Sequence, residues 1–229
     1  MAFLTDKYEK IKTELALNNV TLVAVSKTKP AEDILEAYHA GQRDFGENYV
    51  QELIDKYEAL PKDIRWHFIG HLQSNKVKYI APFVHLIHGV DSEKLFLEIN
   101  KQAVKLNRSI SCLLQVHISA EETKFGLDED ELNAIIHTIT TDQKKYERVS
   151  VKGLMGMASF TEDNDLIISE FKKLKGLFDR SNAQLSTINS QFSILSMGMS
   201  ADYRFAVEAG STMVRIGSML FGSRIRNTN

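Results

Sequence analysis

The sequence contains few of the features that would anchor a fold covalently or in a membrane. Among its 229 residues there is a single cysteine, Cys112, so no disulfide can form within the chain. Cys112 lies in an apolar run, where we expect a small buried side chain rather than a reactive thiol. No apolar stretch approaches the about 20 residues of a transmembrane helix, and the first ten residues do not resemble a signal peptide. This composition predicts a cytoplasmic protein.

An excess of charge of one sign is also absent. The 28 Lys and Arg residues nearly balance the 30 Asp and Glu residues, for a net charge of −2. Such a balance argues against a surface built to bind nucleic acid or an anionic membrane. Proline is scarce, with three residues, and no Gly-rich or Ser-rich linker divides the chain. We therefore expect residues 1–229 to form one domain with a sizeable core.

What the sequence does contain is a regular alternation of short apolar runs and longer amphipathic segments. Leu4, Tyr8, Ile11 and Leu15 recur at helical spacing and predict a helix at the start of the chain. Strands are then predicted over 20–25, 43–46, 66–69, 84–90, 110–118, 149–155, 192–195 and 212–216. Helices are predicted over 31–40, 49–58, 74–80, 93–103, 129–140, 166–178 and 201–209, the fourth of them capped by Asp91-Ser92.

Eight strands that alternate with helices favour a (β/α)8 barrel with an extra N-terminal helix. Continuously apolar strands are expected where both faces of a parallel sheet are buried. A doubly wound open sheet would share most of this pattern and is the alternative. In both folds the functional residues follow the carboxyl ends of the strands.

Lys27 follows the first predicted strand. It is either a lysine whose stem packs inward while its ammonium reaches water, or a desolvated amine able to form a Schiff base. After the seventh strand, Ser196–Ser200 is typical of an anion cradle in front of a helix that we expect to begin near Ala201. A simple N-cap formed by Ser200 is the alternative.

The eighth strand ends in Arg215, Gly217 and Ser218. In these barrels the loops after strands seven and eight often form a phosphate site, and Gly217 would allow the backbone to approach a ligand closely. Arg215, if it points inward, needs a partner, and a structural ion pair is the alternative to a role in ligand binding. Asn48 follows the second strand and suits either a ligand contact or a turn.

A metal site is not expected. His67 and His71 face the same side of an extended strand but lie about 13 Å apart, too far to share one ion. His85 and His88 are three positions apart and would face opposite sides of their strand.

The sequence resembles a known family, the small pyridoxal phosphate homeostasis proteins. Members of this family look like the barrel domain of alanine racemase without its second domain. The segments that carry the resemblance are AVSKTKP (24–30), FGENYVQE (45–52), WHFIGHLQSNK (66–76), EETKFGL (121–127), GLMGMASF (153–160) and LSMGMSADYRFAVEAGSTMVRIGSMLFGSR (195–224). They extend from the first predicted strand to the last.

The resemblance implies that the chain binds pyridoxal 5'-phosphate (PLP). It implies that Lys27 forms an aldimine with the PLP aldehyde and that Ser200, Gly217 and Ser218 hold the phosphate. It also implies that Arg215 faces the pyridine nitrogen. It further places Asn48 beside the ring, and His67, Met199 and Met157 are weaker candidates for the pocket wall.

The implied function is to hold PLP and supply or buffer it, so that catalytic residues and nucleic-acid or membrane partners are not expected. Apo PLP-dependent enzymes are the expected acceptors, and the protein is expected to be a monomer. A racemase of this type needs a second acid/base group from another domain, for which we expect no room in 229 residues. The alternatives are such an amino-acid racemase, a Schiff-base aldolase that binds a sugar phosphate, and a scaffold without a ligand.

Overall fold

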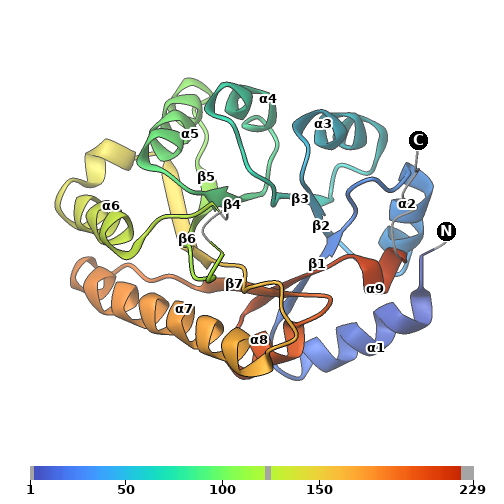
Figure 1. Cartoon of the computed structure of the whole chain (residues 1–229). Coiled ribbons are helices and arrows are strands. Elements are labelled where there is room, and N and C mark those ends of the chain that lie inside the picture. Colours follow the sequence, from blue (N-terminus) through green and yellow to red (C-terminus); the bar gives the residue numbers. More distant parts are fainter. Residues whose placement is uncertain (1–2, 122–124, 223–229) are drawn as a thin grey trace.

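The computed structural model of the chain describes residues 3–121 and 125–222. Its eight parallel strands close into a barrel in the order β1 to β8, and helices surround the barrel (Figure 1). The last strand pairs with the first, with Leu22 opposite Val214 and Ala24 opposite Ile216. The predicted (β/α)8 barrel is therefore confirmed and the open sheet is wrong. No helix within the described residues combines the length and the apolar character needed to cross a bilayer.

The elements alternate regularly along the chain. The strands are β1 (Thr21–Val25), β2 (Asp44–Glu47), β3 (Arg65–Phe68), β4 (Leu86–Val90), β5 (Ile110–Gln115), β6 (Val149–Met155), β7 (Ile194–Met199) and β8 (Met213–Ile216). The helices are α1 (Thr5–Ala16), α2 (Ala31–His39), α3 (Val50–Ala59), α4 (Val77–Ile80), α5 (Glu93–Lys105), α6 (Glu129–Thr141), α7 (Asn164–Leu185), α8 (Tyr203–Glu208) and α9 (Ser218–Phe221). Short 3-10 helices cover Ser74–Lys76, Gln143–Tyr146 and Ser186–Ile188.

The strands are continuously apolar because they serve two separate cores. Val23 of β1 points into the barrel, where it packs with Leu86 and Met213 among others. Its neighbours Leu22 and Ala24 belong to the larger core between the strands and the surrounding helices. Cys112 is also part of that larger core and is fully buried, which raises the pKa of its thiol, as expected of a small apolar side chain.

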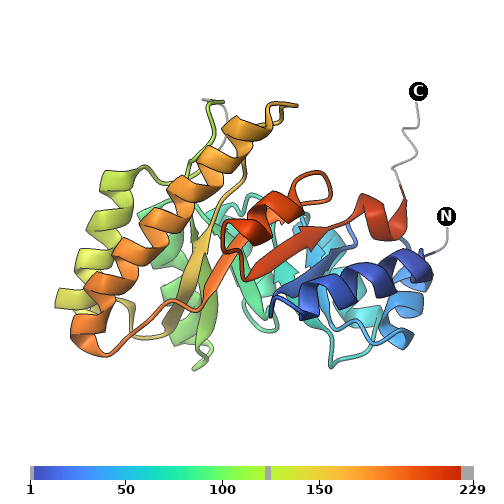
Figure 2. The same ribbon diagram turned by 90° about the horizontal axis from the view of Figure 1, so that it is seen from below.

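Side-chain caps fix the starts of several helices. The Ser92 hydroxyl accepts a hydrogen bond from the Leu95 N–H (3.4 Å) at the start of α5, as predicted. Asp128 and Glu131 form a capping box at the start of α6. The predicted N-terminal helix is α1, which lies beside α9 (Figure 2), and the Leu4 N–H donates to the Leu220 carbonyl (2.8 Å).

The boundaries around β7 differ from those predicted. The strand continues to Met199 instead of ending at Leu195, since Ser196 pairs with Met213 and Met199 with Arg215 of β8. Small residues such as Ser196 are typical of loops, but here they are strand residues whose size suits the inside of the barrel. Elsewhere, β5 ends at Gln115 rather than 118, and β4 begins at Leu86 rather than 84.

Gly153 allows β6 and β7 to pair closely. A Cβ atom on Gly153 would lie 1.7 Å from the Ile194 carbonyl oxygen, so no side chain fits there. We expect Gly153→Ala to lower the free energy of unfolding by about 3 kcal/mol. Gly176→Ala in α7 is the matched control. Its new methyl group meets nothing closer than 3.7 Å, and the change should stabilise the helix by about 1 kcal/mol.

Urea unfolding followed by circular dichroism measures both variants. Equal unfolding midpoints for the two alanine variants would contradict this account of how β6 and β7 pair.

Candidate functional site

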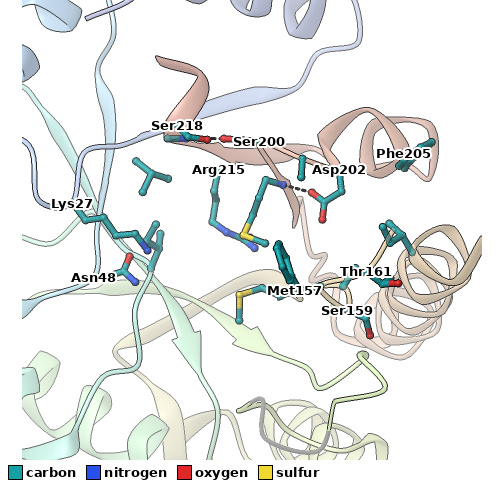
Figure 3. Close-up of a pocket in the computed structure, with 18 of the residues that line it drawn as sticks. Lys27, Asn48, Met157, Ser159, Thr161, Ser200, Asp202, Phe205, Arg215 and Ser218 are labelled. Carbon is teal, nitrogen blue, oxygen red and sulfur yellow. Dashed lines mark hydrogen bonds between the residues drawn. The ribbon is translucent and has the colours of Figure 1, made fainter. Parts of the chain in front are cut away.

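A cavity of about 620 Å³ opens at the carboxyl ends of the strands. All seven residues predicted from the sequence to form the site line this cavity: Lys27, Asn48, Met199, Ser200, Arg215, Gly217 and Ser218. Met157, a weaker candidate, lines it as well, whereas His67 does not. Figure 3 shows Lys27 and Asn48 on one side of the cavity, with Ser200 and Ser218 on another and Arg215 between them. Barrel closure therefore brings together residues from both ends of the sequence.

Lys27 stands on a tightly held turn just after β1. The next residue, Thr28, has a φ of 63°, which is unusual for a β-branched residue. The Thr28 N–H donates to the Glu52 carboxylate (2.6 Å), and the Ser26 hydroxyl donates to Glu47 Oε1 (2.5 Å). Backbone strain of this kind persists only where the surroundings hold it in place, and it often accompanies a functional residue.

A buried ion pair between Lys56 and Glu47 supports the turn that carries Lys27. The Lys56 ammonium lies 2.8 Å from Glu47 Oε1 and 2.7 Å from Glu52 Oε1. It also donates to the Ser26 carbonyl (2.8 Å). Burial raises the pKa of Glu47 from 4.5 to about 7, while the nearby Lys56 opposes this rise. Neither Glu47 nor Lys56 is among the residues predicted from the sequence, although a lysine on the apolar face of the helix over 49–58 is a signal for a buried partner.

The other side of the cavity is formed by Ser200, Gly217 and Ser218. The Gly217 N–H donates to the Ser200 hydroxyl (3.3 Å), so two groups that could bind an anion lie together. A Cβ on Gly217 would be 3.2 Å from both the Cβ and the carbonyl oxygen of Val25, which explains why the smallest residue stands there. Lys29 adds a cation on the cavity wall, and its ammonium donates to the Phe221 carbonyl (2.6 Å).

Two predictions about the segment after β7 are wrong. Helix α8 begins at Tyr203 rather than near Ala201, and its N-cap residue is Asp202, so Ser200 does not cap a helix. Asp202 lines the cavity and was not predicted; its Oδ1 accepts a hydrogen bond from the Met199 N–H (2.6 Å). This contact ties the end of β7 to the start of α8 and leaves Ser200 in the turn between them.

Arg215 forms the inner wall of the cavity with a buried guanidinium group. Its Nη1 donates to the carbonyl (3.0 Å) and the hydroxyl (2.7 Å) of Ser196, and its Nη2 donates to the Gly156 carbonyl (3.2 Å). Burial lowers its pKa from 12.5 to about 10, so the group remains a cation at neutral pH. Arg215 forms no ion pair within the described residues. The structural ion pair that the sequence left open as an alternative is therefore wrong.

Asn48 completes the site with a polar atom that is not satisfied by the protein. Its side-chain oxygen is buried and has no hydrogen-bond partner among the described residues. Buried polar atoms of this kind are uncommon in folded proteins, and those that line a cavity are natural contacts for a ligand.

The histidines are arranged differently from the sequence prediction. His67 and His85, on neighbouring strands or just before them, come together with Asp44 so that their ligand atoms lie within 4.8 Å of one another. Only pairs within one strand were considered from the sequence, and pairing between β3 and β4 creates this cluster. Both carboxylate oxygens of Asp44 are held by Arg65, at 2.7 and 2.5 Å, and one of them also lies 3.0 Å from His67 Nε2. These groups therefore bind one another.

The chain is similar to known proteins over most of its length. The family model named alanine racemase, N-terminal domain, matches residues 2–225. The pyridoxal phosphate homeostasis protein of Vibrio alginolyticus is 40% identical over 223 residues, covering 95% of this chain and 92% of the relative. The protein of that name from Homo sapiens is 43% identical over 213 residues, 89% of this chain and 76% of the relative.

A solved structure is similar over the whole fold. PipY of Synechococcus elongatus PCC7942, solved with PLP bound, superposes with a TM-score of 0.84 at 34% identity. The match covers 95% of this chain and 99% of that one.

The buried pair of Glu47 and Lys56 leads to a prediction about stability and pH. Because the folded-state pKa of Glu47 lies above its ordinary value of 4.5, its share of the stability is greatest below pH 4.5 and falls as the pH rises through about 7. Lys56→Met should therefore cost about 3 kcal/mol of unfolding free energy at pH 8, where Glu47 would be a buried charge without its partner. At pH 5 Glu47 is protonated and the cost should be clearly smaller.

Urea unfolding at the two pH values measures this difference. The double variant Glu47→Gln/Lys56→Met, which carries neither charge, is the control and should show no such dependence on pH. A loss from Lys56→Met that is equal at pH 5 and pH 8 would show that the pair is not charged in the folded protein.

Proposed function

We propose that this chain, which belongs to the pyridoxal phosphate homeostasis protein family built on the alanine racemase N-terminal domain, binds PLP and serves to hold and supply it. The proposal rests on one observation: Lys27 and the hydrogen-bonded pair of Ser200 and Gly217 line the same cavity. An amine on one wall and anion-binding groups on another match the aldehyde and the phosphate of PLP. PipY, a relative of the same fold, has been solved with PLP bound.

The residues that line the cavity fit the chemical groups of PLP. We propose that Lys27 joins the aldehyde carbon as an imine, with release of one water molecule. Ser200, Gly217 and Ser218 supply hydroxyl and N–H donors to the phosphate, and Lys29 adds a positive charge. Asn48, with its unpartnered oxygen, lies beside the ring, and Met199 and Met157 form apolar parts of the wall. The whole chain acts as one PLP-binding domain.

Arg215 favours a carrier over an enzyme. Bound PLP supplies an electron sink for reactions at amino-acid carbons, and the strength of that sink depends on a proton at the ring nitrogen. Arg215 only donates hydrogen bonds and remains charged, so beside that nitrogen it neither supplies a proton readily nor stabilises one there. We propose that the protein retains PLP in the cytoplasm as a monomer and passes it to apo PLP-dependent enzymes.

One test of the proposed function concerns the covalent link between Lys27 and PLP. Lys27→Ala should abolish the visible absorption band that appears when PLP is added to the wild-type chain, because the imine cannot form without that amine. Lys29→Ala is the matched control. It removes the neighbouring lysine of the same cavity and should keep the band.

Reduction with borohydride and peptide mapping locate the modified lysine. Trapped PLP on Lys29 in the wild-type chain would contradict the assignment. A wild-type chain that gives no band at all would contradict the proposed function and would favour a Schiff-base aldolase.

Another test concerns the binding of the PLP phosphate by Ser200. Ser200→Ala removes a hydroxyl that faces the Gly217 N–H, and it should weaken PLP binding about tenfold, the cost of one hydrogen bond to a charged group. Binding of pyridoxal, which has the same aldehyde but no phosphate, should change less than about twofold by the same reasoning. Equilibrium titration followed by absorbance measures both. An equal loss for the two ligands would mean that Ser200 does not contact the phosphate.

A further inference from the structure

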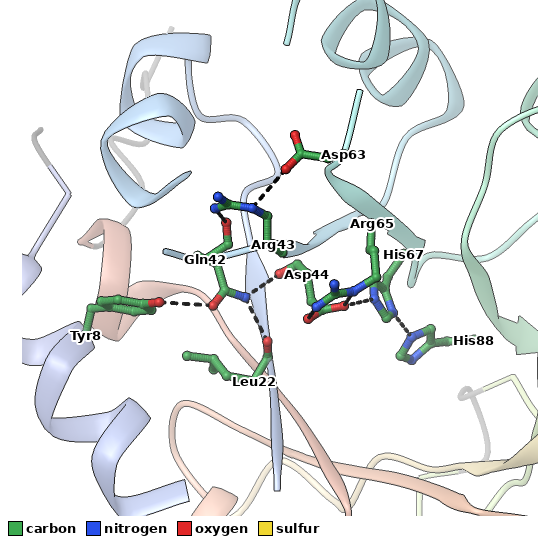
Figure 4. Close-up of polar contacts among 9 residues, drawn as sticks. All are labelled: Tyr8, Leu22, Gln42, Arg43, Asp44, Asp63, Arg65, His67 and His88. Carbon is green, nitrogen blue, oxygen red and sulfur yellow. Dashed lines mark hydrogen bonds and ion pairs between the residues drawn. The ribbon is translucent and has the colours of Figure 1, made fainter. Parts of the chain in front are cut away.

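A continuous row of hydrogen bonds crosses the inside of the barrel and ends at Arg215. The Arg215 guanidinium donates to the Ser196 hydroxyl (2.7 Å), and that hydroxyl lies 3.2 Å from His88 Nδ1. His88 Nε2 lies 2.9 Å from His67 Nδ1, and His67 Nε2 lies 3.0 Å from Asp44 Oδ1. Figure 4 shows the half of this row between Asp44 and His88. The five residues come from five strands, which are β2, β3, β4, β7 and β8.

The row connects the two ends of the barrel. Arg215 lines the cavity at the carboxyl ends of the strands. Asp44 is the first residue of β2, at the amino ends, where it pairs with the half-exposed Arg65. Between these ends, His67, His88 and Ser196 are buried in the barrel interior.

When each histidine ring carries one hydrogen, the acceptor-only carboxylate of Asp44 sets the direction of every hydrogen bond in the row. Arg215 can only donate, so the Ser196 hydroxyl accepts from it, and the hydrogen of that hydroxyl remains available to His88 Nδ1. His88 then carries its hydrogen on Nε2 and donates to His67 Nδ1. His67 in turn carries its hydrogen on Nε2 and donates to Asp44, whose carboxylate can only accept. All the hydrogens therefore point from Arg215 towards Asp44.

The protonation states of the groups agree with this order. Burial would raise the pKa of Asp44, but hydrogen bonds from His67 and Arg65 outweigh it and lower the pKa from 3.8 to about 2. Complete burial, together with the positive charge of the neighbouring Arg215, lowers the pKa of His88 well below 6.5. At neutral pH the row thus has a cation at one end, an anion at the other and an uncharged His88 between them.

We propose that Asp44, acting through His67, His88 and Ser196, is the remote positioning group of Arg215. The carboxylate whose charge acts on Arg215 directly is Asp202, which lines the same cavity, whereas Asp44 reaches the guanidinium only through the row of hydrogen bonds. Ser196 and His88 hold that guanidinium in one orientation at the cavity wall. The part of this inference that concerns the cofactor rests on the proposed function, since Arg215 faces PLP only if PLP binds in the cavity.

The first experiment uses the chain without PLP. Long-range ¹⁵N–¹H NMR spectra of ¹⁵N-histidine-labelled protein report which ring nitrogen carries the hydrogen in each of the seven histidines. Single substitutions at His67 and His88 assign their signals. We expect both rings to carry their hydrogen on Nε2 and to accept a hydrogen bond at Nδ1. A hydrogen on Nδ1 of either ring, or a charged ring, would overturn the inference.

Asp44→Asn tests whether the two ends are coupled. The amide that replaces the carboxylate can donate as well as accept, so the direction of the row is no longer imposed. We expect the Nδ1–H form to appear in the spectrum of His88, a residue that Asp44 does not contact. His85→Gln is the matched control, because the His85 ring lies 5.4 Å from that of His67 but is not part of the row. A His88 signal that is unchanged in Asp44→Asn, or altered equally by His85→Gln, would overturn the coupling.

The last experiment tests the connection with the cofactor. Ser196→Ala removes the link between Arg215 and His88 and should weaken PLP binding about tenfold, as expected for a lost hydrogen bond to a charged group. The visible circular dichroism of bound PLP should weaken as well, because it depends on a fixed ring orientation. His88→Gln, which keeps one acceptor and one donor, should lose less affinity than His88→Leu, and His85→Gln should bind as the wild type does.

The outcomes separate the two proposals. If the wild-type chain binds PLP but Ser196→Ala and His88→Leu bind it equally well with unchanged circular dichroism, the role of the row at the cavity is wrong. If the wild-type chain does not bind PLP, the proposed function fails and the cofactor part of this inference fails with it. The NMR spectra without PLP then still decide whether Asp44 and Arg215 are coupled.

Discussion

The pairing of β8 with β1 is the contact on which the whole site depends. Lys27 stands near the start of the chain, whereas Gly217 and Ser218 stand near its end, and no local interaction could bring them together. In a closed barrel the register between Ala24 and Ile216 places the residues that follow each strand on the same rim. The glycine at 217 then lets the backbone pass close to Val25. An open sheet made of the same strands would leave the amine and the anion-binding groups at opposite edges.

A second constraint is the free-energy cost of burying charged side chains near the carboxyl ends of the strands. Arg215, Lys56 and Glu47 are buried, and a buried charge without a partner is strongly destabilising. Lys56 and Glu47 pair directly and in doing so hold the strained turn at Thr28. Arg215 instead spreads its hydrogen bonds over neutral oxygens of Ser196 and Gly156. The charges therefore support the positions of cavity residues in addition to balancing one another.

The sequence patterns were sufficient to favour the barrel and to place Lys27 and Gly217 at its rim, and the family resemblance added other residues of the cavity, but Asp202 was missed. Buried parallel strands are apolar throughout, and the residues after them must meet at one rim, so Lys27 and Gly217 could be assigned to the same region. The contacts across strands could not be predicted in this way. The approach of His67 to His85 depends on the register of β3 and β4, and the extension of β7 through Ser196 depends on its pairing with β8. Side-chain partners such as Lys56 and Glu47 depend in turn on how a helix is rotated against its strand.

The direction of the hydrogen bonds inside the barrel bears on what the cavity can do. In the proposed arrangement every hydrogen in the row points away from the cavity, from Arg215 towards Asp44. To deliver a proton to the cavity along this path, Arg215 would have to release one, and both histidines and Ser196 would have to exchange theirs. Each of these changes opposes the charges at the two ends. The interior of the barrel is thus arranged to keep a cation fixed at the cavity wall, which suits the retention of a ligand better than repeated proton transfer to it.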